Sequence, residues 1–150
     1  MSRIAEVIVL AQDAETVMDP LTRPDPTRTW QGCFAEMSPT GTSGFGWGAE
    51  FERMSGRSGL LKHLESLPWP RPETVQILIH DEEDDCFGLW MIHDGRLVEV
   101  PLPRTRRAWW SGPPKDGRAP DPGILSRTDC RPVDWPAEIE GGDQFRPPAW

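Results

Sequence analysis

The densest group of side chains that could bind an ion or move a proton lies between residues 80 and 93. His80 precedes an uninterrupted acidic run, Cys86 follows it, and His93 closes the stretch; the acids are Asp81, Glu82, Glu83, Asp84 and Asp85. Carboxylate oxygens and imidazole nitrogens are common ligands of divalent metals. The spacing matches neither the EF-hand loop, which needs alternating Asp/Asn and a central glycine, nor the HExxH motif. Three interpretations stay open: a small metal-assisted hydrolase using His80, Asp81–Asp85 and His93, a solvated hairpin loop, or a contact patch for a basic partner.

Nucleophilic catalysis has less support in the sequence. Cys86 directly follows the acids, whose negative charge raises a thiol pKa and disfavours the reactive thiolate. Cys33 and Cys130 have no histidine beside them, and three cysteines without CxxC spacing predict reduced thiols. No GxSxG sequence is present. An acid–base pair is a weaker alternative, drawn from His63, His80, His93, Glu65 and Asp94. We expect no enzymatic activity and no cofactor.

The elements that must position the acidic loop are short strands. Residues 75–80, 86–93 and 96–102 are apolar runs rich in β-branched and aromatic residues. Asp94-Gly95 is a strong hairpin signal, because a type I′ turn needs positive φ at both central positions. The pattern predicts a three-stranded antiparallel meander. Alternation predicts a mixed face that carries Trp90 and an opposite core face with Val75, Ile77, Ile79, Phe87, Leu89, Met91, Val98, Val100 and Leu102.

The preceding residues supply the rest of the predicted core. Residues 4–10 form a nearly continuous apolar strand, and residues 45–51 alternate large side chains with glycines, which suggests that something approaches closely on the glycine side. Residues 58–67 predict a helix with Ser55 or Ser58 as N-cap and an inward stripe of Leu60, Leu61, Leu64 and Leu67, while Lys62, His63 and Glu65 look outward. Residues 12–44 are rich in proline and predict a loop with a short strand at 29–34.

Composition changes after Pro103. Residues 101–150 contain ten prolines, which disfavours helix and sheet, together with tryptophans whose burial would be worth several kcal/mol each, roughly. We therefore expect residues 104–150 to form an irregular arm packed on a core domain of residues 1–103. The basic stretch from Arg104 to Trp110 is expected to fold back onto the acidic loop, arginine to carboxylate. Together these elements predict an α+β fold: a mostly antiparallel sheet of about five strands, in the order β-β-α-β-β-β, with one helix on one face.

The net charge of the chain limits the kinds of molecule that it can bind. The net charge is −8, and residues 1–103 hold 17 acidic against 8 basic residues. Such a surface repels nucleic acid phosphates and anionic lipids and attracts basic proteins. No stretch approaches the roughly 20 apolar residues of a membrane span, and the acid at position 6 interrupts any signal peptide. We expect a cytoplasmic protein with no nucleic-acid or membrane partner.

Size, acidity and layout over residues 4–102, with the run from His80 to Trp90, resemble the immunity proteins that bacteria make against basic toxin domains of polymorphic secretion systems. The resemblance implies a stoichiometric inhibitor that covers its toxin, and no functional residue is carried over from that family. The acids at 81–85 would pair with a cationic cleft and an aromatic side chain would anchor the interface. The expected contact residues are Asp81, Glu82, Glu83, Asp84, Asp85, Trp90, Trp109 and Trp110. The alternatives are the hydrolase above and an accessory subunit whose tail orders on a larger assembly.

Overall fold

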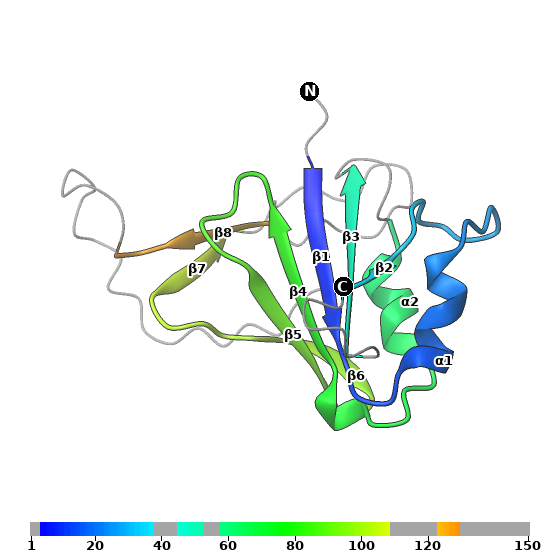
Figure 1. The fold of residues 1–150 in the computed structure, drawn as a ribbon. Helices are drawn as coiled ribbons and strands as arrows, with labels where there is room; N and C mark the ends of the chain where they lie inside the picture. Colours follow the sequence, from blue (N-terminus) through cyan, green and yellow to red (C-terminus); the bar gives the residue numbers. More distant parts are fainter. Residues whose placement is uncertain (1–3, 38–44, 53–57, 109–122, 130–150) are drawn as a thin grey trace.

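The computed structural model describes residues 4–37, 45–52, 58–108 and 123–129, and these residues form an α+β fold. Its main element is a six-stranded, fully antiparallel sheet (Figure 1). The strands, in spatial order, are β2 (Ala35–Glu36), β3 (Gly46–Glu52), β1 (Ile4–Leu10), β4 (Gln76–Asp81), β5 (Gly88–His93) and β6 (Arg96–Val100). The predicted fold class is therefore confirmed, with one strand more in this sheet than expected.

β1 lies at the centre of the sheet, paired with β3 on one side and β4 on the other. Its odd-numbered residues Ala5, Val7 and Val9 are completely buried, because they face the helical layer. The helical layer comprises α1 (Glu15–Met18), a 3₁₀ turn η1 (Asp19–Thr22) and α2 (Leu60–Ser66). Figure 1 shows α1 and α2 side by side at one side of the sheet. A second 3₁₀ turn, η2 (Pro72–Thr74), leads into β4.

The predicted helix is present, and its leucines face the core as expected. Leu60 and Leu64 are buried, and Leu61 and Leu67 pack against the core cluster. The N-cap prediction is wrong: Gly59 occupies that position with a φ of 78°, and no side chain caps the helix. The expectation that His63 and Glu65 face outward is also wrong. His63 accepts a hydrogen bond from Trp30, and Glu65 accepts one from the backbone N–H of Leu97 in β6.

Residues 12–37 contribute more to the core than their prolines suggested. Met18, Leu21, Trp30 and Phe34 are almost fully buried, and the rings of Trp30, Phe34 and Phe51 meet edge to face about 6 Å apart. The strand expected at 29–34 is instead the two-residue β2 that follows it. Proline limited regular hydrogen bonding here without preventing burial, so large aromatic side chains fill the space between helix and sheet.

The meander β4–β5–β6 is confirmed, including its turn, in which Asp94 and Gly95 both have positive φ. The predicted face assignment is wrong for β5 and β6. Trp90 lies opposite Ile77 and is fully buried in the core, whereas Leu89 and Met91 share the other face with Leu78. Periodicity defines two faces within each strand but not which face of one strand matches which face of the next.

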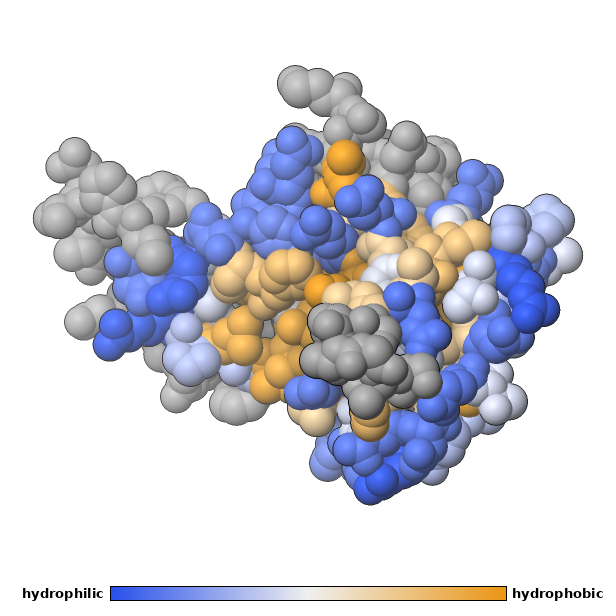
Figure 2. Space-filling view, viewed as in Figure 1, coloured by the Kyte–Doolittle hydropathy of each residue, from blue (hydrophilic) through white to orange (hydrophobic). Residues whose placement is uncertain are grey.

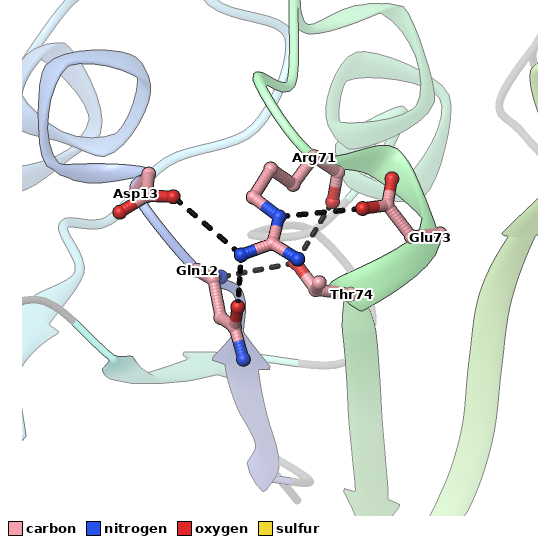
Figure 3. Close-up of polar contacts among 5 residues, drawn as sticks. All are labelled: Gln12, Asp13, Arg71, Glu73 and Thr74. Carbon is pink, nitrogen blue, oxygen red and sulfur yellow. Dashed lines mark hydrogen bonds and ion pairs between the residues drawn. The ribbon is translucent and has the colours of Figure 1, made fainter.

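A polar cluster joins the end of β1 to the start of β4 (Figure 3). Arg71 bonds the side chains of Gln12 and Glu73 and lies 3.8 Å from Asp13, and the backbone N–H of Gln12 donates to Thr74 Oγ1. Its members come from the two segments that leave and enter the central strands. We assign this cluster a structural role, because its polar groups bond to one another and link the segment after β1 to the segment before β4.

Beyond Pro103, β7 (Thr105–Ala108) and β8 (Ile124–Arg127) pair as a second, two-stranded antiparallel sheet. The expectation of an arm without sheet structure is therefore wrong for these residues. Trp109 and Trp110 lie outside the described residues. Within the described part of the chain, no helix has both the length and the apolar character that crossing a bilayer requires.

Candidate binding surface

The acidic loop between β4 and β5 is a folded turn rather than a uniformly solvated one. Asp81 is fully buried and Asp84 is 8% exposed. The Asp84 carboxylate accepts hydrogen bonds from the backbone N–H groups of Asp81 and Leu125, at 2.9 and 2.7 Å. Burial raises the pKa of Asp84, while these two bonds oppose that change. The Asp84 carboxylate therefore stabilises the turn through Asp81 and binds β8 to the turn through Leu125.

Asp85 extends this attachment. Its side chain accepts a hydrogen bond from the backbone N–H of Arg127 at 2.6 Å, and its own N–H donates to the carbonyl of Leu125. Two of the five acids thus engage β8 through backbone groups. Glu82 and Glu83 remain exposed at the tip of the loop.

The basic stretch after Pro103 folds back as expected, and the closest ion pair of Arg107 is with Glu99 of β6. Arg107 pairs with Glu99 at 2.6 Å, lies 5.1 Å from the Trp90 ring and donates to the carbonyl of Gly123. Burial raises the pKa of Glu99, and Arg107 counteracts it. The arginine therefore covers Trp90 and pairs with Glu99 of β6, and its charge also lowers the pKa of Asp84 in the acidic loop.

The burial of the expected site residues determines which of them a partner could contact directly. Asp81, Asp84 and Trp90 are buried in this structure, so they are not available as direct contact residues. The proposed hydrolase cluster is not assembled, because His80 and His93 lie at opposite ends of the paired strands β4 and β5. Among residues 4–37, 45–52, 58–108 and 123–129, no three His, Cys, Asp or Glu side chains are grouped in a way that could hold a metal ion.

The thiols agree with the expectation from sequence in the part that is described. Cys33 and Cys86 are free and half-buried. Burial raises the pKa of Cys86, with Asp84 and Asp85 acting in the same direction and Arg127 and Arg107 against it. Cys86 is therefore a poor thiolate nucleophile.

A surface that the sequence did not reveal lies on the side of the sheet opposite the helices. Strand register places Ile8, Leu78, Leu89 and Val100 in one row across β1, β4, β5 and β6, and Met91 beside Val98 in the next row. We call these six side chains the apolar face. Val98 is 36% exposed and the other five are half-buried. Figure 2 shows apolar atoms gathered over the middle of these strands.

Acidic side chains border the apolar face at the end of the sheet nearest the acidic loop. Glu50, Glu6 and His80 form the adjacent row across β3, β1 and β4, and both glutamates are exposed. Glu82 follows, with its N–H bonded to the carbonyl of Ile4. His80 stacks on Phe87 at 4.9 Å and lies 3.7 Å from Glu6. Hydrophilic atoms appear above the apolar ones in Figure 2.

The glycines of β3 lie on this side of the sheet, as their alternation with large residues predicted. A side chain at Gly48 would meet the Met37 sulfur at 3.0 Å, so the group that approaches closely is a methionine from the segment after β2. Met37 is 41% exposed and extends the apolar surface toward β3. The signal that could have revealed the apolar face is the number of aliphatic residues at both alternating sets of positions in residues 75–102.

Comparison with protein-family models, with curated proteins and with solved structures finds no match to this chain. The geometry of its own residues is therefore the basis for a functional argument.

Proposed function

We propose that this chain is a non-enzymatic binding protein of the immunity type, which neutralises a basic toxin domain by covering it in the cytoplasm. The observation that carries the proposal is the apolar face with its acidic border. Sheet faces of a folded domain normally bury their aliphatic side chains against another layer, whereas these six keep part of their surface in solvent, and a contiguous apolar patch with a polar rim is typical of a protein interaction site.

The two parts of the surface contribute differently to binding. Aliphatic residues such as Leu78, Leu89 and Met91 lose water contact when a partner covers them, and this burial supplies affinity. Glu6, Glu50 and Glu82 attract a positively charged partner from a distance and orient it, which mainly raises the association rate. A nucleic acid would be repelled by the same charges, so the expected partner is a protein with an apolar centre and a basic rim.

The acidic loop retains a role in this proposal, but a narrower one. Glu82 and Glu83 are placed to meet basic side chains, whereas Asp81 and Asp84 add negative potential from within the domain. Trp109 and Trp110 stay predicted contact residues.

The experiment is binding of the purified chain to a basic toxin domain encoded by a neighbouring gene, measured by interferometry together with inhibition of the toxin. Leu78→Arg should weaken binding by about 100-fold or more, because a charge replaces a central apolar contact. Glu6→Lys should slow association by about tenfold at low salt and much less at high salt.

The matched control is Glu15→Lys. It makes the same charge change on α1, on the helical side of the sheet, and should leave the association rate within about twofold. Thermal melts establish that each variant is folded. Equal binding by the folded Leu78→Arg chain and the wild type would reject the apolar face as the interface.

A further inference from the structure

A cavity of about 310 Å³ lies on the helical side of the molecule, away from the apolar face. It is open to solvent on one side and is lined by residues of α1, of η1, of the loop at 25–28 and of the C-terminal part of α2. Its lining includes three aliphatic side chains and three that are charged or can be: Val17, Leu21, Leu67, Asp25, Arg28 and His63. Small-molecule sites combine apolar walls with a few fixed polar groups in this way, and this volume is at the lower end of their range.

His63 presents a fixed hydrogen-bond donor to its surroundings. Its Nδ1 accepts a hydrogen bond of 2.8 Å from Trp30 Nε1, and an indole N–H can only donate. The neutral ring must therefore carry its proton on Nε2. Burial lowers the pKa of His63, with Arg28 acting in the same direction and Asp25 against it, so the neutral form prevails at neutral pH.

Arg28 is held rigidly at the cavity. Its Nη2 donates to the carbonyls of Arg23 and Gly32, at 2.6 and 3.1 Å, and the guanidinium lies 4.0 Å from the Trp30 ring centroid. A guanidinium that is already immobilised loses little further side-chain entropy when a carboxylate binds. The cavity thus has a preorganised positive group beside the His63 donor.

Asp25 supplies the opposite charge. Its Oδ1 accepts hydrogen bonds from the Thr27 backbone N–H and hydroxyl, at 2.9 and 2.6 Å. These bonds lower the pKa of Asp25, so it is ionised at neutral pH. A bare anion in the cavity would be repelled by Asp25 and a bare amine by Arg28, whereas a molecule with both charges satisfies both groups.

We propose that this cavity binds a free α-amino acid with an aliphatic side chain. The carboxylate meets Arg28 and the N–H of His63, the ammonium meets Asp25, and the side chain packs on Leu21 and Leu67. This site is independent of the proposed immunity function, because no residue of the apolar face lines it.

The test titrates the full chain with L-leucine and follows backbone amide signals by NMR. We expect saturable shifts at residues of α1, the 25–28 loop and α2, with a dissociation constant of about 1 mM or below. 4-Methylpentanoate, which lacks the ammonium, and 3-methylbutylamine, which lacks the carboxylate, should each bind about tenfold more weakly or worse. Absence of shifts with leucine at about ten times that concentration, or equal affinity for all three, overturns the proposal.

Two substitutions separate ligand recognition from folding. Asp25→Asn retains an oxygen acceptor for Thr27 but removes the charge, so leucine binding should weaken about tenfold while that of 4-methylpentanoate should not weaken. His63→Asn keeps an acceptor for the Trp30 N–H, but the N–H groups of its shorter amide do not reach the position of His63 Nε2, so both ligands should lose affinity. Unchanged leucine affinity in both folded variants would contradict the assignment.

Discussion

The guanidinium of Arg107 is almost entirely shielded from water, since its side chain is 6% exposed and that of its partner Glu99 is 16% exposed. Removing one member of such a pair leaves the other charge buried without compensation. Arg107→Met should therefore lower the free energy of unfolding in urea by about 3–5 kcal/mol. The double variant Arg107→Met/Glu99→Leu should recover much of that loss, because Glu99 is then no longer a buried charge without its partner. A double variant as unstable as the single one would show that the loss comes from packing on Trp90 instead.

The partial burial of His63, with Arg28 nearby, makes stability depend on pH. The pKa of His63 is lowered in the folded chain from its usual 6.5, so its contribution is complete above about 6.5 and is lost as the pH falls through the folded-state pKa. Thermal melts between about pH 7 and 5 should show this loss in the wild type. His63→Asn keeps the acceptor without titrating, so its melting temperature should change less over the same interval.

At the scale of an element, the start of α2 depends on a glycine for two separate reasons. Gly59 has a φ of 78°, and a Cβ there would lie 2.6 Å from Thr29 Oγ1. Gly95 in the β5–β6 turn has a similar φ of 74° but open space around it. Gly95→Ala should therefore cost about 1 kcal/mol of unfolding free energy from backbone strain alone, and Gly59→Ala clearly more. Equal losses in chemical denaturation would mean that Thr29 moves away without cost.

The strands themselves could be predicted from sequence, because each one is a short alternating or apolar run with turn residues at its ends. What the pattern could not provide is the register between strands. It is this register that places Trp90 opposite Ile77 and turns Leu89, Met91 and Val98 outward. The apolar face could not be predicted for the same reason, since it exists only when four strands are aligned.

A run of five adjacent acids predicts a solvated loop or a contact patch for a basic partner, which would relieve the repulsion among them. In the folded chain, amide groups of a strand about 40 residues later meet Asp84 and Asp85. A contact between residues so far apart leaves no local signal in the sequence. The donors are backbone N–H groups, which nearly every residue type carries, so residue type does not reveal them either. Sequence reasoning could identify the loop and its charge, but not that two of its carboxylates are structural.

At the scale of the whole molecule, the β7–β8 sheet completes the core domain rather than being added to it. A chain ending at residue 103 would lack Arg107 and Leu125, leaving Glu99 and Asp84 without these partners. We expect that chain to unfold at least about 3 kcal/mol more readily than one ending at residue 129, as measured in urea. Equal stability of the two chains would show that residues 1–103 form a complete domain.

Asp84 and Asp85 bind β8 by its amide groups, and every amino acid except proline offers the same amide at positions 125 and 127. Mutations can therefore accumulate along β8 while its attachment to the loop persists, provided that position 125 stays apolar. Replacement of Asp84 or Asp85, in contrast, removes the side-chain acceptor itself. Divergent descendants of this chain should accordingly be recognisable by the paired aspartates before Cys86, even after the strand they hold has changed beyond detection.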